Sequence, residues 1–249
     1  MRLDLLLTEK GLAKSRSKAQ TAISEGRVSV NGVKITKPSF DVSGSEAIDV
    51  IDDNRFVSRA GDKLAKALEV FKIDVCGLIA LDIGASTGGF TDCLLQNGAS
   101  RVYALDVGSG QLDEKLRNDE RVVTIENFNA RYAKKEDFAD DIDIICMDVS
   151  FISQTLIYPA CAEILKSGKQ MITLIKPQFE AGKSRIGKGG IVKDKDGKII
   201  KQILEKIDFS ANAYGFNRIN FTESPIQGGD GNCEYLAHFT KINDEGVIL

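Results

Sequence analysis

Two apolar segments of the sequence end in side chains that can hold or move a proton. Asp148 follows the apolar run 144–147, and Lys176 ends the segment 170–176. Ligands of parallel sheets bind beyond the carboxyl ends of the strands, so Asp148 is expected to face a pocket. An unpaired lysine at the end of a buried strand would cost much in desolvation. Lys176 therefore either has a partner and a role, or its stem carries the ammonium to the surface.

A glycine-rich segment, Leu81–Phe90, contains the most specific pattern in the chain. A strand runs into a turn that opens a helix, where glycines let the backbone approach a ligand and the helix start offers free N–H groups. The pattern is not G-x-G-x-x-G and no Walker lysine follows it, which argues against dinucleotide and P-loop sites. An ordinary tight turn is the alternative. Asp106 lies roughly 20 residues further on at a strand end, where an acid can hold two ribose hydroxyls or simply be solvated.

The segments around these residues alternate between strand and helix patterns. Strands are predicted at 78–83, 102–106, 122–126, 142–148, 170–176, 218–223 and 234–240, and helices at 62–71, 89–97, 155–165 and 198–213. Such alternation predicts an α/β fold with a doubly wound, Rossmann-like sheet. The last two strands would form an antiparallel pair in this sheet.

A smaller α+β unit is predicted before this sheet. Residues 2–9 and 17–24 are predicted helices, and Ser15 and Ser17 are candidate N-caps of the second. Alternating apolar residues around Asn31-Gly32 indicate a hairpin with a type I′ turn. We therefore divide the chain into a first domain (1–54), a linker (55–60), a second domain (61–243) and a tail (244–249).

Charge is distributed unevenly along the chain. The net charge is −3, yet residues 1–40 and 166–201 are strongly basic, which suggests local contact with a polyanion unless the lysines only solubilise the surface. No apolar stretch is long enough for a membrane span, and no signal peptide precedes the first domain, so a cytoplasmic protein is expected. The five cysteines are widely spaced and His238 is the only histidine, so no metal is expected.

The first 50 residues resemble the RNA-binding domain named after ribosomal small-subunit protein S-four. The resemblance rests on Arg2-Leu3-Asp4, on Ser15–Gln20, and on Gly26-Arg27-Val28 with Asn31-Gly32. It implies RNA contacts by the basic side chains Arg2, Lys14, Arg16, Lys18 and Arg27. Helical spacing places Lys14 and Lys18 on one face, although a solvated basic helix would look the same.

The glycine segment resembles the loop of the FtsJ-like RNA 2′-O-methyltransferases, and the whole chain resembles the TlyA family, known both as haemolysins and as ribosomal RNA 2′-O-methyltransferases. Further matching segments are 58–64, 147–153, 175–180, 187–194 and 228–236. The resemblance implies S-adenosyl-L-methionine as cofactor, a Rossmann-like methyltransferase domain, and ribosomal RNA or ribosomal subunits as partner, with cytidine as the target. The implied cofactor-binding residues are Asp82, Gly84, Ser86, Thr87, Gly88, Gly89, Phe90, Asp106, Glu126, Asn129 and Asp148.

The resemblance also implies a catalytic set of two lysines and two acids: Lys63, Asp148, Lys176 and Glu234. A ribose hydroxyl is a poor nucleophile and needs a base. A free lysine is mostly protonated at neutral pH, and burial beside a second cation favours its neutral form. Lys176 is then the base, Lys63 the second cation, and the two acids position the lysines.

Three alternatives compete with ribose methylation. Membrane lysis would need a span or a cationic amphipathic helix, and neither is found in the sequence. An RNA-binding assembly factor with an idle methyltransferase fold is not excluded by sequence. Enzymes that methylate exocyclic amines commonly carry prolines where Asp148-Val149-Ser150-Phe151 stands. The sequence leaves open the target nucleotide, the assembly state of the substrate and the oligomeric state. Phe56 and Val57 suggest an ordered linker that couples RNA docking to the cofactor site.

Overall fold

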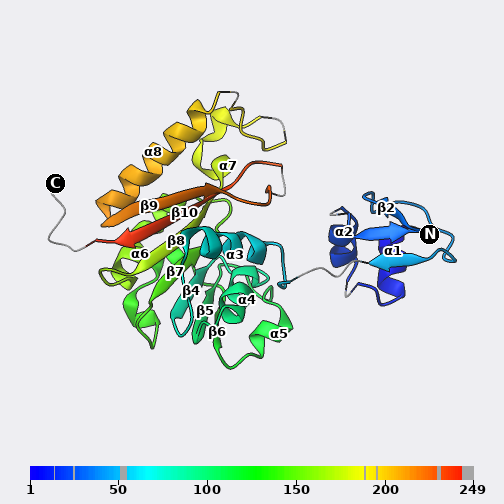
Figure 1. Ribbon diagram of the computed structural model, residues 1–249, viewed down its shortest axis with the longest axis horizontal. Coiled ribbons are helices and arrows are strands. Elements are labelled where there is room, and N and C mark those ends of the chain that lie inside the picture. The colour runs from blue at the N-terminus through cyan, green and yellow to red at the C-terminus, as the bar shows by residue number, and fades with distance from the viewer. Residues whose placement is uncertain are drawn as a thin grey trace. The chain divides into compact units, whose positions relative to one another are not determined.

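The computed structural model describes residues 1–13, 15–24, 26–50, 55–187, 189–194, 196–228 and 231–242. The chain divides into two compact units, Met1–Asn54 and Arg55–Leu249 (Figure 1). Lys14 and the proposed tail 244–249 lie outside the described residues. No helix among those described is long and apolar enough to cross a membrane.

The first unit packs two helices on a three-stranded antiparallel sheet. Its elements are α1 (Leu3–Glu9), α2 (Arg16–Ser24), β1 (Val28–Val30), β2 (Val33–Ile35) and β3 (Ile48–Val50), with the strand order β2-β1-β3. Asn31 and Gly32 both have positive φ, 50° and 78°, as the predicted type I′ turn requires. The Ser15 hydroxyl accepts a hydrogen bond from the Lys18 N–H at 3.3 Å. Ser15 is thus the N-cap of α2, and Ser17 lies inside the helix.

The second unit is built on a seven-stranded sheet with the order β6-β5-β4-β7-β8-β10-β9. The strands from β6 to β8 are parallel, and β10 joins the sheet antiparallel between β8 and β9. The predicted α/β class and its antiparallel pair are confirmed. The strands are β4 (Ile79–Ile83), β5 (Arg101–Leu105), β6 (Val122–Ile125), β7 (Ile144–Met147), β8 (Gln170–Ile175), β9 (Phe216–Glu223) and β10 (Tyr235–Lys241).

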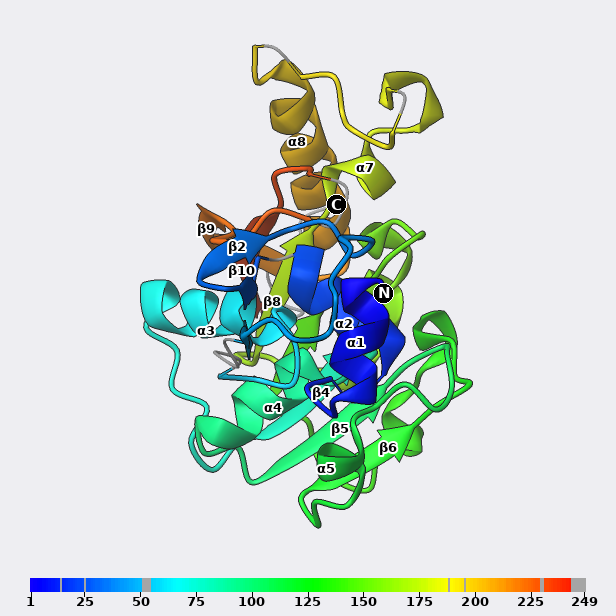
Figure 2. The ribbon, with the colours of Figure 1, turned by 90° about the vertical axis from the view of Figure 1, so that its right-hand side faces the viewer.

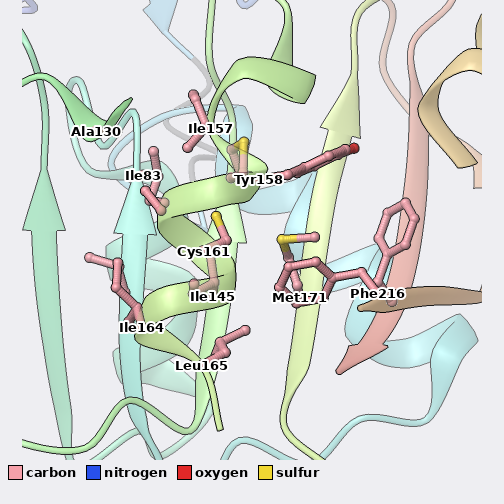
Figure 3. Packing of buried hydrophobic residues seen from close by; sticks show 14 of the residues in the cluster. Ile83, Ala130, Ile145, Ile157, Tyr158, Cys161, Ile164, Leu165, Met171 and Phe216 are labelled. Atoms are coloured by element: carbon pink, nitrogen blue, oxygen red, sulfur yellow. The ribbon is translucent and has the colours of Figure 1, made fainter. Parts of the chain in front are cut away.

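Helices cover both faces of this sheet because its central strands are apolar on both sides. The α-helices are α3 (Ala60–Phe71), α4 (Gly89–Gln96), α5 (Glu114–Arg117), α6 (Tyr158–Ile164), α7 (Pro177–Glu180) and α8 (Lys198–Ala213), and the short 3₁₀ turns are η1 (Ala130–Tyr132), η2 (Lys135–Asp137), η3 (Gln154–Leu156) and η4 (Lys183–Arg185). Residues of α6 share one core with Ile145 and Met171 (Figure 3). Residues of α8 belong to the same core. Residues of α3, α4 and α5 share the other core with Cys146 and Ile172. Alternate residues of one strand therefore serve opposite layers.

The predicted helix 155–165 is divided in the structure. η3 (Gln154–Leu156) precedes α6, which begins at Tyr158 with Pro159 in its first turn. Proline has no N–H to give to a preceding turn, so it fits a helix start and not a helix interior. α5 and α7 have only four residues each, too few to produce a recognisable apolar period.

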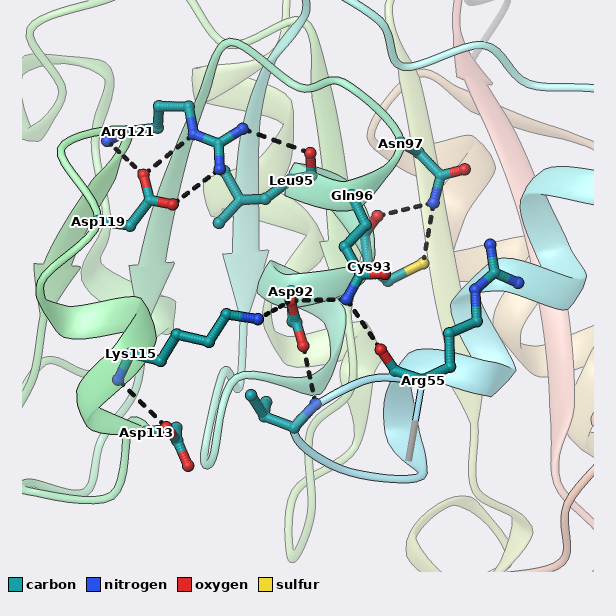
Figure 4. A network of polar contacts seen from close by, with 11 residues as sticks. Arg55, Asp92, Cys93, Leu95, Gln96, Asn97, Asp113, Lys115, Asp119 and Arg121 are labelled. Carbon is teal, nitrogen blue, oxygen red and sulfur yellow. Dashed lines mark hydrogen bonds and ion pairs between the residues drawn. The ribbon is translucent and has the colours of Figure 1, made fainter. Parts of the chain in front are cut away.

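The segment expected as a linker is packed onto the second unit. Phe56 is buried, and the Val57 N–H donates to the Asp92 carboxylate at 2.8 Å. Asp92 lies on α4 and is itself 2% exposed; it also accepts from Gln96 at 3.0 Å (Figure 4). A buried acid on α4 thus fixes the backbone that leads into α3.

The only histidine yields a test of the fold. His238 on β10 is 4% exposed, stacks on Phe71 and bonds to Gln170 through Nε2 at 2.9 Å. Burial lowers the pKa of His238 to about 4. Between pH 6.5 and 4, His238 is therefore protonated in the unfolded chain but neutral in the folded chain. The free energy of unfolding should fall on acidification, by up to roughly 3 kcal/mol.

Urea unfolding of the wild type and His238→Gln across this pH range isolates the histidine, because the other titrating groups are common to both proteins. The stability of the wild type relative to the variant should decrease as the pH falls. A difference that is constant between pH 7 and 4 would contradict the assignment.

Candidate active site at the carboxyl edge of the sheet

The glycine loop after β4 is held in a conformation that disfavours side chains. Gly84 and Gly88 have φ of +86° and +94°, and Ser86 has φ of +48°. A Cβ on Gly84 would lie 2.5 Å from the Asp148 carbonyl oxygen. The loop therefore passes directly against the end of β7, which places the predicted glycine residues and Asp148 side by side.

Asp82 lies under this loop on β4 and is fully buried. Its Oδ2 accepts from the Thr91 hydroxyl at 2.7 Å, while its Oδ1 has no hydrogen-bond partner among the described residues. Burial raises the pKa of Asp82 to about 7, and the nearby Asp148 and Asp106 carboxylates contribute to the rise. A buried acid with a free oxygen beside two other acids is suited to a cationic neighbour.

Asp106 follows β5 and receives two backbone N–H groups. Ser86 donates to its Oδ2 at 2.8 Å and Gly108 to its Oδ1 at 2.7 Å. These bonds join the glycine loop to the turn after β5. Val107, the next residue, is 71% exposed. The acid predicted to hold ribose hydroxyls is thus fixed at the rim of the site, next to an exposed apolar side chain.

Other predicted cofactor residues contact the protein itself. The Thr87 carbonyl accepts from the Asp113 N–H at 3.2 Å. Phe90 is 2% exposed, with its ring in the core against α3. Glu126 accepts from Arg117 at 2.7 Å, which lowers its pKa to about 2. Asn129 caps η1 by accepting from the Arg131 N–H at 3.1 Å. The ring of Phe90 therefore packs in the core, and Asn129 stabilises the turn of chain that follows β6.

Lys176 has a partner at the end of the neighbouring strand. Its Nζ lies 2.6 Å from Asp148 Oδ1 and donates to the Ser150 hydroxyl at 2.8 Å. Both charged side chains are mostly buried, 13% and 14% exposed. Lys176 is extended, with φ −107° and ψ 102°, and precedes Pro177 at the start of α7. The strand end thus aims the amine at the loop after β7.

A second lysine–carboxylate pair lies at the amino end of β10. Lys63 on the first turn of α3 donates to Glu234 Oε2 at 2.5 Å, and the two side chains are 11% and 3% exposed. Tyr235 pairs with Ile175 in the antiparallel register of β10 and β8. Continuing that register by one residue sets Glu234 across from Lys176. All four predicted catalytic residues therefore gather at one edge of the sheet.

The start of α3 is pressed onto the start of α4. Gly89 is the first residue of α4, and a Cβ there would run into the Ser58 hydroxyl, the Ala60 side chain and the Gly61 N–H. Only a glycine leaves this space. The close approach fixes the helix that carries Lys63 directly over the glycine loop.

Sequence reasoning missed the roles of two residues near Lys176. Phe151 has φ of +64°, which is unusual for a bulky residue, and is 92% exposed. Its ring tilts against Phe179 with the centroids 5.2 Å apart. Glu180 is buried and accepts from Ser153 and Gln154. Phe151 lies in the motif at 147–153 and Glu180 in the motif at 175–180. The residue types alone do not indicate the backbone strain at Phe151 or the burial of Glu180.

The predicted RNA-binding arginines of the first unit are ordered by a buried acid. Asp4 is fully buried and accepts from Arg2, Arg16 and Gln20 at 2.7–3.0 Å. The Arg2 hydrogen bonds hold the pKa of Asp4 well below its usual range. Arg2 and Arg16 keep 41% and 51% of their side chains exposed. Lys18 is exposed on α2, and Arg27 is half-buried just before β1.

The residues of the site fit S-adenosylmethionine, whose sulfonium and ammonium groups are cationic. Asp82, Asp106 and Asp148 surround the glycine loop, and burial together with their mutual repulsion raises the pKa of Asp82. Bound here, the cofactor would supply an activated methyl group, while the chain supplies carboxylates, backbone N–H groups and the lysines. No group of three or more His, Cys, Asp or Glu residues in the described part of the chain could hold a metal ion.

Comparison with protein families and curated proteins shows the family of the chain. Residues 56–241 match the FtsJ-like methyltransferases and residues 1–48 match the S4 domain. Hemolysin A of Brachyspira hyodysenteriae is 51% identical over 96% of this chain and 99% of its own. The Mycobacterium tuberculosis protein named 16S/23S rRNA (cytidine-2'-O)-methyltransferase TlyA is 41% identical over 99% of this chain and 92% of its own.

Solved structures show the same architecture. A Streptococcus thermophilus protein, 45% identical, superposes with a TM-score of 0.78 over 98% of this chain and 89% of its own. An S-adenosylmethionine-dependent methyltransferase of Mesorhizobium loti, 15% identical, shares the fold of the second unit with a TM-score of 0.51 over 70% of this chain and 96% of its own. The predicted family is confirmed: the chain belongs to the TlyA family of FtsJ-like, S-adenosylmethionine-dependent methyltransferases, which carry an S4 domain at the amino end.

Proposed function

We propose that the protein transfers a methyl group from S-adenosylmethionine to the ribose 2′-hydroxyl of a cytidine in ribosomal RNA. Two relatives carry that activity in their names, the Mycobacterium tuberculosis protein and a Campylobacter jejuni protein that is 37% identical over 97% of this chain. A ribosomal substrate also implies an enzyme that works in the cytoplasm. In this proposal the first unit docks RNA, and the second holds the cofactor and the reacting ribose.

The observation that carries the proposal is the pair of lysine–carboxylate contacts, Lys176–Asp148 at 2.6 Å and Lys63–Glu234 at 2.5 Å. A hydroxyl attacks a methyl group only if its proton is taken away as the new bond forms. In the proposal the neutral amine of Lys176 accepts that proton, and the ammonium that results is held by the Asp148 carboxylate. Lys63 orients the hydroxyl oxygen. Asp148 and Glu234 hold the amines in place, so that attack in line with the methyl group is favoured by positioning.

Phe151 suggests how the nucleotide is presented. Its exposed ring stands three residues after Asp148 and leans on Phe179. Exposed aromatic rings stack on unpaired bases, and enzymes that modify RNA commonly extract the target nucleotide from its helix. A base stacked on Phe151 would bring its own ribose toward the lysine pair.

Basic residues in the second unit offer a further RNA contact. Arg185, Lys193, Lys198 and Lys201 lie between α7 and the first turn of α8. Asn232 anchors this segment: it accepts from the Val192 N–H and donates to the Gly190 carbonyl, each at 3.0 Å. Asn232 lies two residues before Glu234, so the basic segment is tied to the catalytic edge.

Lys176→Ala should reduce methyl transfer to ribosomal subunits by about 100-fold or more, because the proposed base is lost. The control is Lys169→Ala. Lys169 bonds to Asp143 at 2.6 Å, between the same two strands but at their amino ends. That variant should lose stability without losing activity. Labelled methyl from S-adenosylmethionine, located on the ribose by nuclease digestion, gives the rate and the product. Normal transfer by a folded Lys176→Ala protein would refute the assignment.

Cofactor binding should depend on the charge of Asp82. A cation binds more tightly to the ionised carboxyl, so affinity for S-adenosylmethionine should rise with pH and level off above about 7, the pKa of Asp82. Calorimetry at pH 6 in two buffers of different ionisation enthalpy should reveal proton release on binding, which Asp82→Asn should abolish. Equal release by the variant and the wild type would show that Asp82 is not the group responsible.

The first unit should contribute electrostatically to RNA binding. Lys18→Ala should weaken binding of ribosomal RNA several-fold and reduce the slope of log affinity against log salt by about 0.9. Lys10→Ala is the matched control, since Lys10 is also an exposed lysine of the first unit and lies outside the predicted contact set. Equal losses in the two variants would indicate a general charge effect and not a docking site.

A further inference from the structure

A buried acid joins the two segments that carry Asp148 and Lys176. Glu180 ends α7, and its side chain is 2% exposed. Its Oε1 accepts from the Gln154 N–H at 2.9 Å, and its Oε2 accepts from the Ser153 hydroxyl at 2.6 Å and from Lys206 Nζ at 3.1 Å. Both oxygens of a single carboxylate are thus used.

These contacts close the loop after β7 at its far end. The loop begins where the Asp148 N–H bonds to the Ile83 carbonyl at 2.9 Å. It ends at Ser153 and Gln154, which Glu180 holds, and its middle is held by the bond from Lys176 to Ser150 at 2.8 Å. Lys176 precedes the single turn of α7 and Glu180 ends it, so this one turn holds the loop at two points.

The loop so held contains the strained, exposed Phe151. A φ of +64° places this bulky residue in the left-handed region, a conformation that persists only where the surroundings enforce it. The anchors on both sides of Phe151 provide that enforcement. Without the hydrogen bonds from Ser153 and Gln154 to Glu180, the loop would relax. Ser150 and Phe151 would then move from their positions.

Lys206 extends the arrangement to helix α8. It contacts both the carboxylate and the main-chain carbonyl of Glu180, the latter at 3.3 Å. α7 and α8 lie side by side in both views (Figures 1 and 2). The ammonium of Lys206 offsets the cost of burying the acid, and its partial exposure, 49%, places it at the surface end of the contact.

We propose that Glu180, secured by Lys206, is a positioning residue: it holds the loop after β7 in its strained form so that the Lys176–Asp148 pair and the Phe151 ring face the same substrate. This role rests on the proposed function of Lys176 and Phe151. In this role Glu180 acts through the loop and not by contact with substrate or cofactor. Its effect should therefore appear in the rate of transfer and not in the affinity for S-adenosylmethionine.

Glu180→Gln tests this role directly. The amide keeps one acceptor oxygen but turns the other into a donor. That donor opposes the Gln154 N–H if it replaces Oε1, or Lys206 if it replaces Oε2. The matched control is Asp208→Asn, which breaks the paired hydrogen bonds from Arg218 to Asp208, both 2.6 Å, on the same helix α8. Asp208 is paired with a residue of β9 and not with the loop, so its variant reports the cost of a weakened helix alone.

Single-turnover transfer at saturating cofactor and ribosomal subunits should be slower by at least about tenfold in Glu180→Gln, with the dissociation constant for S-adenosylmethionine changed by less than about twofold. Lys206→Met should act in the same direction but less strongly, because Glu180 keeps its bonds to Ser153 and Gln154. Asp208→Asn should lower the melting temperature without slowing transfer. Equal rates in Glu180→Gln and Asp208→Asn would overturn the proposal.

A second readout follows the loop itself. The chain contains no tryptophan, so Phe151→Trp places a single tryptophan on the loop, which can be excited selectively. The fluorescence anisotropy of this residue should fall when Glu180→Gln is added, and should stay constant when Asp208→Asn is added. Unchanged anisotropy in the Glu180→Gln background would also overturn the proposal.

Different results would refute the proposed function and the positioning role of Glu180. A folded Lys176→Ala protein with full activity would refute the proposed function on which Glu180 depends. Loss of activity in Lys176→Ala together with a normal rate in Glu180→Gln would refute the positioning role alone.

Discussion

Buried charge is the constraint on the edge of the sheet where the two lysine–carboxylate pairs lie. Lys63, Glu234, Lys176 and Asp148 are each less than 15% exposed, and a buried ammonium without a carboxylate beside it would be strongly destabilising. Each lysine must therefore keep its acid, although the partners come from distant parts of the chain. α3 packs against β10, which brings Lys63 to Glu234. The antiparallel register of β10 and β8 sets this pair beside the strand end that carries Lys176.

Close approach between backbone segments around these residues determines where glycine is needed. Gly84 meets the carbonyl of Asp148, Gly89 meets the start of α3, and Gly228 meets the carboxylate of Glu234, whose Oε1 would lie 2.5 Å from a Cβ added to this glycine. At each of these points two backbone segments bring a charged residue into place, and a methyl group would separate them. Bond formation in line with a leaving group tolerates little displacement, so these contacts serve geometry as much as stability.

The sequence was sufficient for the fold class, the order of the long elements and the family, because these depend on apolar periodicity and on turns such as Asn31-Gly32. It also named the two lysines and two acids, through motifs, but not which acid pairs with which lysine. The pairing of Lys176 with Asp148 depends on the adjacent ends of β8 and β7, and that of Lys63 with Glu234 on the packing of α3 against β10. Three features result from tertiary packing, and the local sequence does not reveal them. They are the burial of the Phe90 ring in the core, the positive φ of Phe151 and the burial of Glu180.

Charge separation within one chain helps to explain how an acidic protein can select RNA. The net charge is −3, yet residues 1–40 and 166–201 carry a large excess of lysine and arginine, so the remainder of the chain is strongly acidic. Acidic surface repels phosphates wherever RNA approaches without engaging the basic segments. Around the glycine loop, Asp82, Asp106 and Asp148 lie beside two lysines, so groups of opposite charge meet at one edge of the sheet. In the proposed function the acids favour the cationic methyl donor and the lysines face the ribose, which would keep the two substrates in separate halves of one site.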